Sequence, residues 1–371
     1  MFVKKVVIGM SGGVDSSVSA ILLKEQGYEV IGLFMRNWDS LMNNDVLGND
    51  SLKNNDICPQ EQDYNDALKV CEKLGIELHR IDFVKEYWDY VFTYFLDELK
   101  KGRTPNPDIM CNKYIKFDLF VKEAKKLGAD YIATGHYAQV KDGKMYKAID
   151  LNKDQTYFLS QIKREQLPSV LFPIGHLNKN EVRNIAKDNN LVTANKKDST
   201  GICFIGERNF TKFLENYLPN QQGKIVNIET KEIVGEHIGL MYYTIGQRRG
   251  LNIGGTKERM FVCGKDLKKN ILYICIGDDN DYLYSDSAII EDVNWLCDIK
   301  PDECMAKFRY RQNDNPVKMS YLDNGKILVN YPQKIKSVTP GQACVFYLDD
   351  LCLGGGIISE VRKNNKKLWY L

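Results

Sequence analysis

The amino-acid sequence predicts an α/β fold: a domain with a parallel sheet, then a small β-rich central domain and a C-terminal β-barrel. Up to about residue 135, short apolar runs alternate with helical patterns, and such alternation forms a parallel sheet with right-handed crossovers. From about Pro219, short alternating runs punctuated by Gly, Asn and Asp take over. We therefore expect domains at residues 1–218, 219–287 and 288–371.

The first strand is predicted at residues 6–10, directly before the string SGGVDSS at residues 11–17. An amphipathic stretch over 18–24 follows, so the order is strand, tight turn, helix. Glycines in such a turn let the backbone adopt positive φ, and a helix N-terminus offers free N–H groups to a phosphate. The string lacks the lysine of GxxxxGK[ST] and the spacing of GxGxxG. It predicts a phosphate site of another type; the alternative is a glycine-rich turn without a ligand.

The remaining elements of the first domain follow the same alternation. We predict strands over 29–35, 77–82 and 130–134, helices over 66–74, 87–99, 115–127 and 178–189 (the last with an asparagine cap), and loops over 37–60 and 196–208. Ligands of such sheets bind beyond the carboxyl ends of the strands. The string at 11–17, the residues after Met35 and the turn at 135–137 all fall on that edge.

The β-rich part is predicted from short, regularly spaced apolar runs. We expect strands over 224–228, 260–264 and 271–276, and near 305–310, 327–330 and 344–348. Short strands at this spacing favour a small barrel.

Composition excludes several classes of protein. Charged residues make up 27%, hydrophobic residues 43%, and the net charge of +2 neither supports nor excludes a nucleic-acid partner. No apolar run reaches the length of a membrane span, and the N-terminal run is too short for a signal peptide, so we expect a cytoplasmic protein without a membrane partner. The ten cysteines contain no CxxC pair and no zinc-type cluster, so no resident metal is expected.

Two cysteines lie among polar residues. The string GRTPNPDIMCN at 102–112 brings Asp108 near Cys111, and its prolines predict a stiff loop that is neither helix nor inner strand. The string DSTGICFIG at 198–206 places Cys203 in a second loop. A loop cysteine is more often inert than reactive, so these strings alone leave both possibilities open. In contrast, three cysteines fall within apolar strand patterns and are expected in the core: Cys263, Cys275 and Cys344.

Eight strings together carry a family resemblance. In chain order they are SGGVDSS, GRTPNPDIMCNKYIKF, ATGHYA, KDQTYFLS, KDSTGICFIGERNF, YTIGQRRGL, RYRQ and TPGQACVFY. The first resembles the SGGxDS loop of the N-type ATP pyrophosphatases, whose domain is adenine nucleotide alpha hydrolase-like. All eight together resemble the bacterial and organellar tRNA-specific 2-thiouridylases, from residue 3 nearly to the end. The loop at 37–60 is longer than the family norm.

The resemblance implies an ATP-dependent sulfur transfer to tRNA. ATP, with Mg²⁺ on its phosphates, would adenylate the C2 oxygen of the wobble uridine in tRNAs for Lys, Glu and Gln. Sulfur would then replace that oxygen, and AMP and pyrophosphate would be released. Cys203 would carry the sulfur as a persulfide and Cys111 would be the catalytic nucleophile, with a transient Cys111–Cys203 disulfide and Asp108 as acid or base. A sulfur donor, either a cysteine desulfurase or a persulfide relay protein, would be a partner besides tRNA.

The resemblance also implies binding residues. The expected ATP contacts are Gly9, Met10, Ser11, Gly12, Gly13, Val14, Asp15, Ser16, Met35 and Gly135. The residues expected around the target base, which must leave the anticodon stack, are Asn106, Pro107 and Asp108. The expected tRNA contacts are His136, Lys153, Asp154, Gln155, Arg309, Tyr310, Arg311 and Gln342. Further candidates for phosphate contacts are Lys113, Lys116, Arg248 and Arg249. Without the family, His136 and residues 153–155 would be interpreted as turn residues.

Three alternatives remain open. An adenylating ligase that forms amides or guanidines would share the loop at 11–17 but would need no cysteine pair. An RNA-binding protein with a degenerate nucleotide site would release no pyrophosphate. A redox sensor built on Cys111 and Cys203 would respond to oxidant without ATP.

Overall fold

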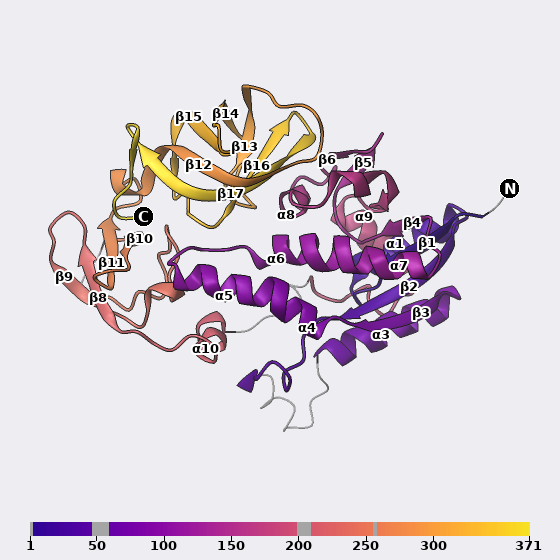
Figure 1. Ribbon diagram of the computed structural model, residues 1–371. Helices are drawn as coiled ribbons and strands as arrows, with labels where there is room; N and C mark the ends of the chain where they lie inside the picture. The colour runs from indigo at the N-terminus through magenta and orange to yellow at the C-terminus, as the bar shows by residue number, and fades with distance from the viewer. Residues whose placement is uncertain (1–2, 47–58, 199–208, 255–257) are drawn as a thin grey trace.

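The computed structural model describes residues 3–46, 59–198, 209–254 and 258–371 (Figure 1). A parallel-sheet domain occupies one end of the molecule, the small central β-domain lies at the other, and an antiparallel β-barrel covers one side. The predicted fold class is confirmed. Among the described residues, no helix is both long and apolar enough to cross a membrane.

The first domain is built on a five-stranded parallel sheet in the order β3-β2-β1-β4-β7. Its strands are β1 Lys5–Gly9, β2 Glu29–Arg36, β3 Glu77–Asp82, β4 Tyr131–Ala133 and β7 Val170–Leu171. Because β1 is central, its residues Val6, Val7 and Ile8 are completely buried. The carboxyl ends of β1, β2 and β4 are adjacent, as predicted, so the segments that follow them meet at one edge.

Helices surround this sheet and extend from it towards the central domain. They are α1 Val14–Glu25, α3 Pro59–Leu74, α4 Val84–Tyr87, α5 Thr93–Lys100, α6 Pro107–Met110, α7 Phe120–Lys126, α8 Thr156–Leu159, α9 Lys179–Asp188 and α10 Phe210–Glu215. Two π-helical segments, η1 Trp88–Phe92 and η2 Cys111–Leu119, fuse α4 to α5 and α6 to α7. The two fused helices lie side by side across the centre of Figure 1. The predicted asparagine cap is confirmed, since Asn178 and Glu181 form a capping box at α9.

The predicted stiff loop at 102–112 is wrong from residue 107 onward. Pro107 is the first residue of α6, a position where the missing N–H costs no hydrogen bond and the fixed φ suits a helix. Asn106 caps this helix, because its side-chain oxygen accepts hydrogen bonds from the backbone N–H groups of Asp108 (3.1 Å) and Ile109 (3.4 Å). Cys111 therefore lies on a helix.

The rest of the chain is mostly β-structure. The central sheet, in the order β10-β11-β8-β9, consists of β8 Gly223–Asn227, β9 Ile233–His237, β10 Met260–Asp266 and β11 Ile271–Ile276. The barrel consists of β12 Tyr284–Trp295, β13 Glu303–Lys307, β14 Asn315–Tyr321, β15 Ile327–Lys336, β16 Ala343–Leu348 and β17 Leu351–Lys363, with β18 Lys366–Lys367 at its edge. Pairing of β12 with both β15 and β17 closes the barrel. Short 3₁₀ helices in the described ranges are η3 Arg164–Ser169, η4 Leu240–Tyr242 and η5 Asp281–Leu283.

A hairpin from the first domain extends the barrel sheet. Strands β5 Gln139–Lys141 and β6 Lys144–Tyr146 pair with each other, and Tyr146 pairs with Leu351 of β17. The barrel is thereby joined to the segment that follows β4. The three predicted core cysteines, Cys263, Cys275 and Cys344, are completely buried.

Candidate nucleotide and thiol site

The loop between β1 and α1 is tightly enclosed, and two glycines make this possible. Gly12 has a φ of +69°, and a Cβ at this position would overlap the carbonyl oxygen of Asp63. A Cβ on Gly135 would lie 2.7 Å from the backbone nitrogen of Ser16. The helix begins after Gly13, and no side chain of the described residues caps it, so within this part of the chain its first N–H groups are left for another acceptor. This geometry suits an anion.

The predicted ATP residues divide into a buried and an accessible group. Met10, Val14 and Met35 belong to the core, and a Cβ on Gly9 would make ordinary contact with the end of the Met35 side chain. Ser11 is exposed, and its backbone N–H donates to the hydroxyl of Ser16 at 3.2 Å. The backbone and hydroxyl groups of the loop are thus the groups available to a ligand.

Asp15 links the loop to a second helix. Its carboxylate accepts hydrogen bonds from the Tyr137 hydroxyl at 2.9 Å and from the Lys179 amine at 2.7 and 2.9 Å. Lys179 is only 9% exposed and is the first residue of α9, which packs against α1. Nothing in the local pattern NKNEVR indicates that this lysine reaches the loop, so its position could not be predicted from the sequence.

The same amine contacts Asp198, at 2.9 Å. Asp198 also pairs with Lys153 at 2.6 Å and with Arg183 at 2.9 Å. Burial works to raise the pKa of Asp198, but the hydrogen bonds from Lys153 and Lys179 outweigh it and lower that pKa to about 2. We call these five residues, Asp15, Lys153, Lys179, Arg183 and Asp198, the charged cluster.

Cys111 and Asp108 lie on the helix that starts at Pro107. Three positions separate them, so they share one side of the helix. Cys111 is completely buried and begins the π-helical segment η2, whereas Asp108 is partly exposed. The helix continues into α7, whose Phe120 ring would touch a Cβ on Gly9 at the end of β1. The thiol helix and the glycine loop therefore belong to one packed unit.

Cys203 lies outside the described residues, as do residues 199–206 around it. The structure therefore does not test a bond between the sulfur atoms of Cys203 and Cys111. The pairing of Cys111 with Cys203 therefore stays a prediction.

Three of the predicted tRNA residues are held inside the first domain. His136 is 9% exposed and its Nδ1 lies 2.8 Å from the Thr134 hydroxyl. Burial, with a smaller contribution from the charge of Lys116, holds the pKa of His136 well below its usual value. Asp154 is 3% exposed and accepts from the Thr156 hydroxyl at 2.7 Å, and the Gln155 side chain accepts from a backbone N–H at 2.9 Å. The side chains of His136, Asp154 and Gln155 thus form hydrogen bonds within the first domain.

The predicted tRNA residues of the barrel have different roles. Arg309 is largely buried and donates to two carbonyl oxygens and a hydroxyl: Ile245 O (2.7 Å), Ser337 O (2.8 Å) and Thr339 Oγ1 (2.9 Å). It thus ties the barrel to the central domain. Tyr310 packs on Phe158 of α8, with ring centroids 4.3 Å apart, while Arg311 is exposed.

Gln342 brings the barrel to the segment before the thiol helix. Its side-chain nitrogen donates to the carbonyl oxygen of Thr104 at 2.8 Å, and the N–H of Thr104 donates to the carbonyl of Pro340 at 2.9 Å. The predicted target-base residues, 106–108, follow directly. The exposed pair Arg248 and Arg249 lies in the central domain.

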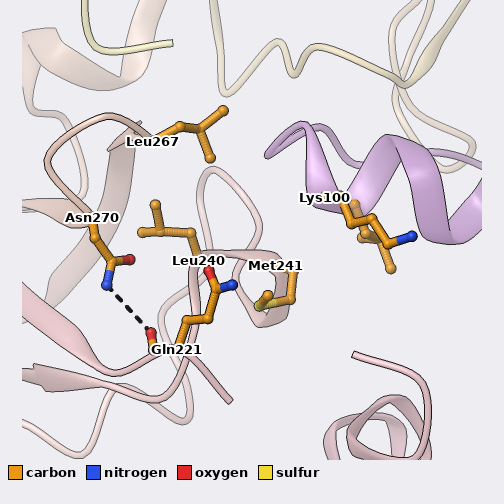
Figure 2. Close-up of a pocket in the computed structure, with 7 residues that line it drawn as sticks. Lys100, Gln221, Leu240, Met241, Leu267 and Asn270 are labelled. Carbon is orange, nitrogen blue, oxygen red and sulfur yellow. Dashed lines mark hydrogen bonds between the residues drawn. The ribbon is translucent and has the colours of Figure 1, made fainter. Parts of the chain in front are cut away.

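A separate cavity lies between the end of α5 and the central domain (Figure 2). Its lining consists of Leu99, Lys100, Gln221, Leu240, Met241, Leu267 and Asn270. The amide of Asn270 donates to the Gln221 carbonyl across its floor, at 3.5 Å. It contains none of the predicted site residues.

Comparison with known families covers nearly the whole chain. Residues 4–207 match the tRNA methyl transferase HUP domain family, residues 211–276 the tRNA methyl transferase PRC-barrel domain family, and residues 285–358 the aminomethyltransferase beta-barrel domain family. A tRNA-specific 2-thiouridylase MnmA of Mycoplasma capricolum is 59% identical, over 97% of this chain and all of that protein. The proteins of that name from Mesoplasma florum and Geobacillus thermodenitrificans are 60% and 55% identical, over 96% and 99% of this chain and 99% and 98% of their own.

Proposed function

The chain belongs to the tRNA-specific 2-thiouridylase family, and from that premise we propose that it is an ATP-dependent sulfurtransferase that makes 2-thiouridine in tRNA. The observation that carries the proposal is one packed unit that holds both a glycine loop with the geometry for an anion and the Asp108–Cys111 helix. Adenylation and sulfur transfer need these two components within reach of one base.

ATP acts as the activating substrate. Its phosphates bind at the glycine loop, where the first N–H groups of α1 and the exposed hydroxyl of Ser11 face the ligand, while the buried Ser16 hydroxyl holds the loop through the Gly13 carbonyl at 3.2 Å. Phosphate oxygens and water would supply most of the Mg²⁺ ligands. Asp15 is the carboxylate of the loop that would provide a further ligand. The C2 oxygen of uridine is a poor leaving group. When this oxygen attacks the α-phosphorus of ATP, pyrophosphate is expelled and the oxygen becomes part of an AMP group. AMP is a good leaving group.

Sulfur arrives on Cys203 as a persulfide. The Cys111 thiolate attacks the Cys203 sulfur, a Cys111–Cys203 disulfide forms, and hydrosulfide leaves. Hydrosulfide adds to C2 of the adenylated base, and AMP departs. Two external thiol groups then reduce the disulfide to the Cys111 and Cys203 thiols and are themselves oxidised to a disulfide. Asp108, one turn before Cys111, transfers the protons of these steps.

The tRNA lies across the seam between the first domain and the barrel. The contacts of Gln342 and Tyr310 already join these parts near residues 106–108. The flipped base would enter there, next to Asn106, Pro107 and Asp108. Exposed arginines, among them Arg311 and Arg248, are available to phosphates of the anticodon arm. Arg309 contributes to tRNA binding indirectly, because it holds the barrel in position. His136 is neutral and contributes to tRNA binding by hydrogen bonding rather than by charge.

The tRNA substrates, the sulfur donor and the cellular compartment are proposed from the resemblance to the family. The substrates are tRNAs for Lys, Glu and Gln, and the sulfur comes from a cysteine desulfurase or a relay protein. The reaction takes place in the cytoplasm. The three domains proposed at 1–218, 219–287 and 288–371 correspond to catalysis, connection and tRNA docking.

The test is sulfur incorporation into tRNA by the purified protein. Unmodified tRNA, ATP, Mg²⁺, a cysteine desulfurase and isotopically labelled cysteine are incubated, and nucleosides are analysed by mass spectrometry. We expect labelled 2-thiouridine only when ATP is present, and none with Cys111→Ser or Cys203→Ser. Cys58→Ser, a cysteine without an assigned role, is the control and should retain activity.

The alternatives give different results. If Cys203→Ser keeps full activity, the persulfide role is refuted. If ATP yields AMP and pyrophosphate but no thionucleoside forms, the protein is an adenylating enzyme for another substrate.

A further inference from the structure

The carboxylate of Asp198 occupies a site built for an anion. Three cations surround it: Lys153 at 2.6 Å, Lys179 at 2.9 Å and Arg183 at 2.9 Å. The carboxylate binds them so well that its pKa stays far below that of a free aspartate, although burial opposes this. A single carboxylate is therefore held where three positive groups converge.

This anion site borders the glycine loop. Lys179 bridges the two, because its amine binds Asp198 and, at 2.7 Å, the Asp15 carboxylate of the loop. The segment that leads to Asp198 is also attached to α1, since the Thr193 hydroxyl donates to that of Ser17 at 3.1 Å. Phosphates bound at the loop would thus lie beside the same amine that Asp198 holds.

The number of cations around Asp198 favours replacement by a phosphate. Three cations contact this one carboxylate, and a polyphosphate carries more negative charge than a single carboxylate does. Lys179 is nearly buried, and a buried ammonium needs an anionic or hydrogen-bonding partner at all times. Asp15 and Asp198 both provide such a partner in the structure, and a polyphosphate, with more charge and more acceptor oxygens than Asp198, provides a stronger one than Asp198 does.

We propose that Asp198 is a built-in competitor of the ATP phosphates: it occupies Lys153 and Lys179 in the free protein, and ATP displaces it. This inference rests on the proposed function, because it requires ATP at the glycine loop. Arg183 stays in place during the exchange, since it also donates to the carbonyls of Ala194 and Lys196, both at 3.1 Å. ATP binding therefore transfers Lys153 and Lys179 from Asp198 to the phosphates, while Arg183 remains as the partner of Asp198.

A different role for Asp198 would be to orient the lysines for ATP. The two roles predict opposite effects of removing its charge. If Asp198 is a competitor, the apparent Kd for ATP is the intrinsic Kd divided by the fraction of protein in which the site is free. Removal of the Asp198 charge then raises that fraction and tightens binding. An orienting residue stabilises the binding geometry, so removal weakens binding.

The experiment measures binding of α,β-methylene-ATP with Mg²⁺ to the full-length protein by calorimetry. We expect Asp198→Asn to lower the Kd about fivefold or more, as for a site that is free in about a fifth of molecules or fewer. Lys179→Gln should raise the Kd, and in that background Asp198→Asn should gain much less, because the shared amine is gone. Asp188→Asn, an equal charge change at the exposed end of α9, is the control and should change nothing.

An unchanged or higher Kd for Asp198→Asn overturns the inference, while thiolation of tRNA by the wild type would leave the proposed function intact. Absence of nucleotide binding to wild type and variants alike overturns both. Asp198→Ser, measured in parallel, keeps the test valid if the asparagine variant fails to fold, as judged by circular dichroism.

Discussion

Replacing Gly135 by alanine tests the close contact between the glycine loop and the end of β4. The added Cβ would lie 2.7 Å from the Ser16 nitrogen, 2.9 Å from the Asp15 carbonyl carbon and 3.1 Å from the Ser16 Cα. All three are backbone atoms, so no side chain can rotate away. The start of α1 must move instead, together with the N–H groups proposed to bind phosphate.

The magnitude follows from this geometry. Overpacking of this kind costs about 1–3 kcal/mol, which corresponds to a decrease in Tm of about 2–12 °C for a domain of this size. Misplacement of a binding or catalytic group by about 1 Å can cost about 100-fold in activity, so we expect the Kd of an ATP analogue to rise at least about tenfold. The effect on binding should therefore exceed what the loss of stability explains.

The assay combines thermal melts with calorimetric titration at a temperature where all variants are folded. Gly254→Ala is the control, because a Cβ there would meet no atom within 4 Å in the described part of the chain. A Gly135→Ala variant with wild-type Tm and wild-type affinity would refute the enclosed-loop geometry. A lower Tm with unchanged affinity would show that the loop does not bind the phosphates.

Three further predictions concern the thiol, the barrel arginines and the buried histidine. Because Cys111 is completely buried, iodoacetamide should alkylate it at least about tenfold more slowly in the folded protein than in urea, as measured by peptide mass spectrometry; equal rates would contradict the burial. Arg309→Met should lower the Tm because three oxygen atoms lose the hydrogen bond from the guanidinium group. Arg311→Ala should leave the Tm unchanged and should reduce the slope of log K for tRNA binding against log salt concentration by about one. A lower Tm for Arg311→Ala together with an unchanged Tm for Arg309→Met would refute these roles. His136 stays neutral when folded but protonates below its ordinary pKa when unfolded, so stability should fall as the pH drops below about 6.5, by at most about 1.4 kcal/mol per pH unit. Melts of His136→Gln from pH 7.5 to 5.5 should show a flatter profile, and an identical slope would refute the assignment.

Local patterns were sufficient for the parallel sheet and its loop. The apolar runs of β1 and β2 and the glycines at 12 and 13 are local signals, and the structure confirms strand, turn and helix at these positions. The cap at Asn178 was equally local. Such features depend on residues within one or two turns of each other, which is why the sequence alone predicts them.

One local signal was misinterpreted, and features that depend on tertiary contacts were missed. Proline near Cys111 indicated a loop, but proline is favourable at the first position of a helix, and the Asn106 cap directly before it marks that position. Lys179 reaches Asp15 because α9 packs on α1, a contact across 164 positions. The hairpin of β5 and β6 joins the barrel through a partner, Leu351, that no local pattern could indicate.

The most direct test of the central claim is the stoichiometry of AMP and 2-thiouridine in one reaction mixture. Both products are quantified from the same samples over time, with unmodified tRNA as the limiting substrate. The proposed mechanism predicts that one AMP forms for each 2-thiouridine, that both require tRNA, and that both stop when the wobble uridine is replaced by cytidine. Thiolation without AMP formation, or steady AMP formation without tRNA, would contradict the proposal that adenylation of the base drives the sulfur transfer.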